Sequence, residues 1–194
     1  MKQHIKRSIK TLFLVLMWPV FLLFCLLAKL GREDSTFQGF SQALSLIPGK
    51  LGVYCRAAFY RLACPDTSDD ISIGFLTLLS HRDTTIEAGV YIGPQCNIGK
   101  CTLGKNTLVG SGVHILSGNK QHGFNDLNTP MQAQQGVYTK IQIGEDCWLG
   151  NTSVIMADVA PQCIVAAGSV VVKPLEEAQS IYAGNPAKWV RGRT

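Results

Sequence analysis

One histidine stands where its side chain could act as a base. His122 lies in the polar segment SGNKQHGF, between two stretches that are rich in aliphatic residues. A neutral imidazole near pH 7 can take the proton of a hydroxyl group as that group attacks a carbonyl carbon. The sequence contains no G-x-S-x-G or other nucleophile motif. We therefore expect direct transfer of a group, without a covalent enzyme intermediate.

Other residues that could do chemistry have simpler explanations. His114 falls inside the repeat described below and is the reserve candidate for the base, and His81 could line a groove. The seven cysteines include no C-x-x-C pair, which gives little support to a zinc site or a disulfide framework. We expect these cysteines to be small buried side chains in a protein of a reducing compartment.

The segments on both sides of His122 follow a six-residue repeat. Neither the 3.6-residue period of a helix nor the alternation of a flat strand produces such spacing. A coil of three short strands puts one aliphatic side chain inward from each side of a triangular prism. Glycine would permit the turns between the sides. An aliphatic residue followed by glycine occurs at Ile92, Ile98, Leu103, Val109, Ile143 and Leu149. The repeat predicts a β fold, a parallel β-helix whose coils stack about 4.8 Å apart.

The repeat also sets the domain boundaries. We expect it to fill residues 65–194, interrupted by a polar excursion loop at residues 116–140. Long excursions from a rigid scaffold often carry function, which agrees with the place of His122. Because Pro174 follows the last repeat, residues 174–194 are expected to form a polar tail that closes the exposed end.

The composition of residues 1–64 predicts a helical region that associates with a membrane. They hold nine Lys or Arg against two acidic residues, whereas residues 65–194 hold nine basic and eleven acidic residues. Residues 11–30 read as an apolar helix, whose uncharged run of 17 residues would extend about 26 Å. Basic residues beside apolar surface suit anionic lipids better than nucleic acid, so no nucleic-acid partner is expected.

Three topologies are compatible with the apolar helix. It could be a secretory signal, although no A-x-A-like cleavage site follows; it could span the membrane; or it could break at Pro19 and return to the cytoplasmic face. Lys29, Arg32 and Lys50 beyond the run favour keeping both flanks inside. Apolar residues at helical spacing then predict an amphipathic helix at about 50–64. This helix would lie either in the membrane interface or against its own domain or a partner subunit.

Three motifs resemble those of left-handed hexapeptide-repeat acyltransferases. They are IGEDCWLGN (143–151), VAAGSVVVK (165–173) and AGNPAKWVR (183–191), in the order found in that family. A fourth stretch, PGKLGVYCRAAFY, resembles membrane-associated O-acetyltransferases of bacterial surface-polysaccharide biosynthesis. The resemblance implies a left-handed parallel β-helix, a homotrimer with acetyl-CoA in the groove between neighbouring prisms, and a catalytic histidine on the excursion loop. His122 is the match for that histidine, and Asp126 or a backbone carbonyl could fix its tautomer.

The resemblance also implies which residues meet acetyl-CoA, and it implies no metal. Small residues would let the pantetheine arm approach the backbone, and cations near the end of the chain would meet the phosphates. Trp148 could instead pack at a subunit contact. The expected cofactor-binding residues are Trp148, Gly150, Asn151, Ala167, Gly168, Lys173, Lys188 and Arg191.

The resemblance therefore implies an acetyl-CoA-dependent O-acetyltransferase that acts on a sugar hydroxyl of a bacterial surface glycan or its lipid-linked precursor. Acetyl-CoA is a cytosolic metabolite, so we expect the enzyme at the cytoplasmic face of the bacterial inner membrane. Two alternatives stay open. A γ-carbonic-anhydrase-like metal lyase would need three converging histidines, and that family's H-x-x-x-x-H pair is absent from the sequence. A non-catalytic, membrane-bound solenoid scaffold would bind no acetyl-CoA.

Overall fold

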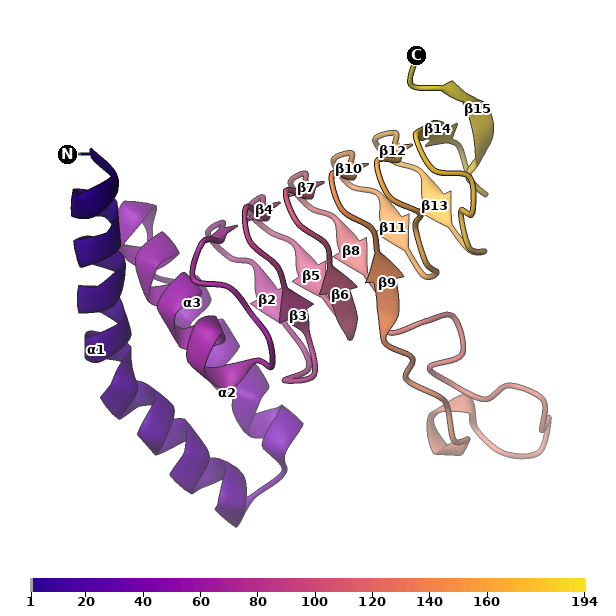
Figure 1. Ribbon diagram of the computed structural model, residues 1–194. Helices are drawn as coiled ribbons and strands as arrows, with labels where there is room; N and C mark the ends of the chain where they lie inside the picture. The colour runs from indigo at the N-terminus through magenta and orange to yellow at the C-terminus, as the bar shows by residue number, and fades with distance from the viewer. Residues whose placement is uncertain (1) are drawn as a thin grey trace.

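The chain forms a long solenoid with a layer of helices packed on its N-terminal end (Figure 1). This computed structural model describes the backbone of residues 2–194 and the side chains of residues 5–194. The helices are α1 (Lys2–Leu30), α2 (Glu33–Ser45) and α3 (Gly49–Ala63). The strands are β1 (Ser72–Ile73), β2 (Leu78–Leu79), β3 (Thr85–Ile86), β4 (Tyr91–Ile92), β5 (Asn97–Ile98), β6 (Cys101–Leu103), β7 (Leu108–Val109), β8 (His114–Ile115), β9 (Ile141–Ile143), β10 (Trp148–Leu149), β11 (Val154–Ile155), β12 (Ile164–Val165), β13 (Val170–Val171), β14 (Ser180–Ala183) and β15 (Lys188–Gly192).

Successive strands go in turn to three sheets, which are the sides of a prism. The first sheet has the order β1-β4-β7-β10-β12-β14-β15, the second β2-β5-β8-β11-β13, and the third β3-β6-β9. Every pairing between coils is parallel. We call the turns after first-sheet strands the first corner, those after second-sheet strands the second corner, and those after third-sheet strands the third corner. The parallel β-helix that the repeat predicts is confirmed.

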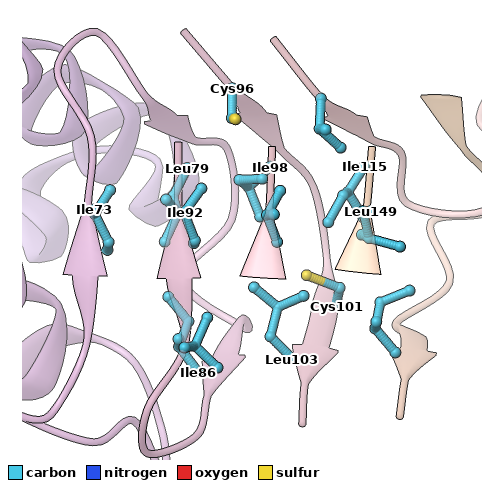
Figure 2. Close-up of a cluster of buried hydrophobic side chains, with 14 of the residues drawn as sticks. Ile73, Leu79, Ile86, Ile92, Cys96, Ile98, Cys101, Leu103, Ile115 and Leu149 are labelled. Atoms are coloured by element: carbon cyan, nitrogen blue, oxygen red, sulfur yellow. The ribbon is translucent and has the colours of Figure 1, made fainter. Parts of the chain in front are cut away.

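The core is a set of aliphatic columns inside the prism. The register places Ile73, Ile92 and Val109 directly above one another, and Leu149 continues the column. All of these side chains are fully buried, and Figure 2 shows the labelled isoleucines and leucines of the three sheets converging between the strands. The preceding residue of each strand points outward because side chains alternate along a strand.

The glycine that follows each aliphatic residue has a different role from the one expected. It does not adopt a positive φ; that conformation falls later in the turns of the first and third corners, for example at Gln95 and Asn106. A Cβ at Gly93 would lie 2.8 Å from the carbonyl carbon of Gly110 in the next coil, and a Cβ at Gly144 would lie 2.5 Å from Pro161. Glycine is therefore required by the close approach of stacked backbones.

The C-terminal segment is more than a polar tail, which corrects the expectation for residues 174–194. Strand β14 pairs in parallel with β12, so the first sheet gains another layer after Pro174. Strand β15 then folds back antiparallel on β14 and covers the end of that sheet. Leu175 also makes a parallel bridge to Val159.

The helical layer differs from the expected one in length and in burial. Helix α1 begins at Lys2 and is continuous through Pro19. Figure 1 shows that α1 is bent along its length but unbroken. An unexpected helix, α2, follows it. Helix α3 is packed on its own domain, between α1 and the first coils, and most of its residues are buried. The alternative in which this helix lies in a membrane interface does not fit that burial.

A buried arginine joins the helices to the solenoid. Arg56 of α3 is fully buried. Its Nη1 donates to the carbonyls of Leu44 and Ile47 at the end of α2, at 3.0 and 2.8 Å, and its Nε donates to the carbonyl of Ile73 in β1 at 3.0 Å. A guanidinium suits this place because the last carbonyls of a helix lack partners and carry partial negative charge.

Replacement of Arg56 tests this joint. Arg56→Ala leaves the carbonyls of Ile47 and Ile73 without this donor, whereas that of Leu44 still accepts from the amide of Ile47. At about 1–3 kcal/mol for each unpaired acceptor, we expect the free energy of unfolding to fall by roughly 2 kcal/mol or more. Arg61→Ala is the matched control, since Arg61 is exposed on the same helix; we expect a change within about 0.5 kcal/mol. Guanidinium titrations in a mild detergent measure both. Equal stabilities of the two variants would contradict the role given to Arg56.

Candidate active site

The loop that carries His122 leaves the solenoid at the second corner. It replaces the short turn between β8 and β9 and projects away from the prism (Figure 1). Its outgoing and returning strands of chain are hydrogen-bonded to each other where the loop leaves the solenoid. The amide of Val137 donates to the carbonyl of Lys120 at 2.7 Å, and the amide of Thr139 donates to the carbonyl of Ser117 at 2.9 Å. His122 is exposed just beyond this paired base. Its imidazole is accessible to a bound molecule.

Asp126 does not orient His122 in this structure. Its carboxylate accepts hydrogen bonds from the amide of Asn128 at 2.9 Å and from the hydroxyl of Thr129 at 2.5 Å. These bonds lower the pKa of Asp126 and stabilise the turn that contains it. Of the two groups expected to fix the tautomer of His122, Asp126 is engaged in its own turn, so a backbone carbonyl is the remaining candidate.

Most of the expected cofactor residues gather around the first sheet and the first corner. Trp148 points outward from β10 and is half exposed, in register between Leu108 and Ile164 of the neighbouring strands. Lys173 lies at the second corner. The other expected cofactor residues lie at first-corner turns or on β15, and they are Gly150, Asn151, Ala167, Gly168, Lys188 and Arg191.

Gly150 and Gly168 are glycines for different structural reasons. A Cβ at Gly150 would lie 2.4 Å from the amide nitrogen of Ala167, so this glycine is required by coil stacking. Gly168 has φ +69° and no atom within 4 Å of its missing Cβ. The surface above Gly168 is therefore open to a ligand, whereas Gly150 faces the next coil.

A single chain places His122 on a different edge of the prism from most of the expected cofactor residues. The loop with His122 starts from the second corner, whereas these residues, apart from Lys173, lie on the first sheet or at the first corner. The five strands of the second sheet separate these two edges of the prism. Within one chain, the candidate base and most of the candidate cofactor residues thus lie on different edges of the prism.

A second polar cluster lies at the second corner, beside the base of the loop. His81 Nδ1 is 3.0 Å from a carboxylate oxygen of Asp34 in α2, and the imidazole packs on the ring of Tyr138 with centroids 5.4 Å apart. A cavity on the other side of His81 is also lined by Asn97 and His114. His114 is thus exposed at a cavity rather than satisfied within a coil turn.

Sequence reasoning missed Asp34, Tyr138 and Asn97 as members of this cluster. A signal was present for Asn97, which precedes Ile98 just as His114 precedes Ile115, so the repeat places both side chains outward on the same sheet. No comparable signal marks Asp34 and Tyr138, because helix α2 and the loop lie outside the repeat.

Most of the cysteines are buried, as the sequence predicts. All seven thiols are free, and six of them are buried. Burial raises the pKa of Cys101 to about 12 and that of Cys147 to about 11, so both are protonated at neutral pH and are poor nucleophiles. Within the described residues, no group of three or more His, Cys, Asp or Glu side chains could hold a metal ion.

Comparisons with known proteins agree with the repeat and the fold. The family model of the bacterial transferase hexapeptide (six repeats) matches residues 83–117. The carnitine operon protein CaiE of Proteus sp. (strain LE138) is 34% identical over 117 residues, which are 56% of this chain and 58% of that protein. A probable macrolide acetyltransferase of Lysinibacillus sphaericus is 34% identical over 114 residues, which are 53% of this chain and 63% of that protein. The chain thus spans less than two thirds of these relatives.

Solved structures extend the likeness to the whole fold. A maltose O-acetyltransferase from Clostridium difficile 630 superposes with a TM-score of 0.70 at 15% identity, covering 85% of this chain and 90% of the other. A hexapeptide-repeat acetyltransferase from Vibrio cholerae O1 biovar eltor, in complex with acetyl-CoA, gives 0.60 at 20% identity, covering 84% and 91%. The chain is a left-handed parallel β-helix built from hexapeptide repeats, and it resembles the hexapeptide-repeat acetyltransferases.

Proposed function

We propose that this chain is an acetyl-CoA-dependent O-acetyltransferase that acetylates a hydroxyl group of a saccharide, with His122 as the general base. The observation that carries this proposal is the exposed His122, held outside a hexapeptide solenoid whose first corner bears the expected cofactor motifs. The likeness to acetyltransferases, one of them a maltose O-acetyltransferase and one bound to acetyl-CoA, supports the reaction class and the donor.

The transfer needs one base and one oxyanion site. The imidazole of His122 takes the proton of the saccharide hydroxyl as its oxygen attacks the acetyl carbonyl carbon. Hydrogen-bond donors around the carbonyl stabilise the tetrahedral oxyanion. The C–S bond then breaks, the acetyl group stays on the saccharide oxygen, and the CoA sulfur leaves and takes the proton back from the imidazolium. No covalent enzyme intermediate is required.

We infer that the working form is a homotrimer, because the candidate base and most of the candidate cofactor residues lie on different edges of one prism. Side-by-side packing can bring the loop of one copy to the first corner of its neighbour. The first sheet exposes an outward column of Tyr91, Leu108 and Trp148, in register on adjacent strands. The loop exposes Phe124 and Leu127. Apolar surface on both parts supports their burial against another copy.

We also propose that α1 lies in the cytoplasmic surface of a membrane rather than crossing it. By length and composition alone this helix could cross a membrane. However, Phe24 on its inner face is fully buried against α2 and α3, and Lys6 and Lys10 bind Asp70 at 3.0 and 2.6 Å. These contacts hold the helix along the domain, and they lower the pKa of Asp70.

The outer face of α1 supports this placement. From Leu12 to Leu30 its exposed side chains recur at helical spacing and, apart from Lys29, are all apolar, as expected for a helix that buries one face in a bilayer. They include Leu12, Val15, Leu16, Leu22, Leu23, Leu26, Leu27 and Leu30. Lys29 and Arg32 are exposed at the end of this face, where they suit anionic lipid headgroups.

Loss of the imidazole tests the chemistry. In His122→Ala, transfer of acetyl from acetyl-CoA to a panel of saccharides should fall by roughly a hundredfold or more, because a general base contributes about that factor. Acetyl-CoA affinity should stay unchanged. Lys120→Ala is the matched control on the same loop, since its side chain is exposed. Full activity of His122→Ala would assign the base to another residue.

Charges on the outer face of α1 test the membrane placement. Leu16→Glu combined with Leu23→Glu should reduce co-flotation with vesicles of phosphatidylethanolamine and phosphatidylglycerol by at least about tenfold, since each buried leucine contributes roughly 1.5–3 kcal/mol. The control, Gln95→Glu with Gln142→Glu, adds the same charge on exposed parts of the solenoid. Undiminished flotation would contradict the placement, as would a reporter fused after Thr194 that proved extracytoplasmic.

A further inference from the structure

Two polar cavities at the second corner are both lined by His81, and we consider them together as one surface. The cavity nearer the loop has a volume of about 130 Å³, and it is lined by Asn97, His114 and Gln121. The cavity nearer the helices has a volume of about 640 Å³, and Arg32, Asp34 and Tyr138 are among its lining residues. We call the combined surface the second-corner groove.

The chemistry of the groove suits a ligand rich in hydroxyl groups. Amide and imidazole side chains can both donate and accept hydrogen bonds, and a carboxylate accepts them. The ring of Tyr138 is half exposed and offers an apolar face. Arg32 and Lys100 are balanced by Glu33 and Asp34 within the same lining, so the groove does not favour a strongly anionic ligand. A neutral pyranose has the matching combination of hydroxyl edges and apolar faces.

The Asp34–His81 pair gives the groove a fixed centre. Because Asp34 holds Nδ1 of the imidazole, the other ring nitrogen is left for a ligand. Asp34 also accepts a hydrogen bond from the amide of Arg82 at 3.4 Å, and the side chain of Arg82 bonds Glu33 and the carbonyl of Ala63. The side chain of His81 is only 15% exposed, so its orientation is set by protein contacts.

One end of the second-corner groove lies beside the loop that carries His122, and the other lies beside the end of the apolar face of α1. Gln121 at one end is the residue before His122. Arg32 at the other end follows Leu30, with which the exposed apolar face of α1 ends. Figure 1 shows the α1–α2 junction and the excursion loop on the same side of the solenoid.

We propose that the second-corner groove binds the saccharide of an acceptor that is linked to a membrane lipid. The lipid would lie beside the C-terminal end of α1, and the saccharide would follow the groove toward the loop that carries His122. This inference rests on the proposed acetyltransferase function. It adds to that function the attachment of the acceptor to lipid and the residues that hold it.

The test uses radiolabelled acetyl-CoA and the full-length protein in a mild detergent. One reaction contains a total lipid extract of the source strain's membranes, and a parallel reaction contains water-soluble oligosaccharides from the same cells. We expect label in the organic phase of the first reaction. Mild acid, which cleaves a sugar–phosphate linkage, should move this label to the aqueous phase.

Substitutions in the second-corner groove test whether labelling of the lipid extract depends on this groove. Tyr138→Ala and Asn97→Ala should each raise KM for the lipid extract by about tenfold, the equivalent of losing roughly 1.4 kcal/mol of contact. Acetyl-CoA affinity should not change. Tyr138→Phe, which keeps the ring face, should retain most of the wild-type KM. Glu176→Ala, an exposed residue outside the groove, is the control.

Each outcome bears on the inference. Label only in the soluble oligosaccharides, or groove variants with wild-type KM for the lipid extract, would overturn the inference and leave the acetyltransferase function standing. A protein that binds acetyl-CoA but labels neither fraction would overturn the proposed function, and the inference with it.

Discussion

The close stacking of coils is the constraint on which the rest of the structure depends. Hydrogen bonds between successive coils hold their backbones so near that a Cβ after the inward aliphatic residue would collide with the next coil, as at Gly93 and Gly144. The inward columns of isoleucine, leucine and valine fill the prism in the same register. A scaffold of this kind leaves little freedom inside, so variation is confined to outward positions and to the corners. The groups that could do chemistry lie in those places, on the excursion loop and at the first corner.

The sequence alone predicts the part of the fold that repeats. A six-residue period identifies the inward residues and the place where the loop interrupts the coils, because each residue's environment follows from its position in the period. The features that it does not predict depend on contacts distant in sequence. The pattern gave no sign that Arg56 is buried, since its partners are carbonyls of α2 and β1. Likewise, the apolar composition of α1 does not reveal that Lys6 and Lys10 turn to Asp70 in the solenoid.

The candidate site also combines features that the sequence predicts with features that depend on contacts distant in sequence. His122 could be selected as a candidate from the sequence because the loop stands out against the repeat, and the candidate cofactor residues could be selected from motifs. Their separation on two edges of one prism follows only from the three-dimensional arrangement, and it makes contact between copies the central requirement of the proposed mechanism. The pairing of His81 with Asp34 also joins segments that no local pattern connects. It places a polar groove between the helical layer and the loop.

Mixed oligomers test most directly the claim that the base of one copy serves the cofactor surface of another. Two inactive variants are needed, His122→Ala to remove the base and Ala167→Trp to block the exposed first corner. When they are co-assembled in equal amounts, about a quarter of the interfaces should combine an intact loop with an intact corner, and acetyl transfer should recover to about that fraction of the wild-type rate. An absence of recovery in oligomers shown to contain both variants would contradict the account.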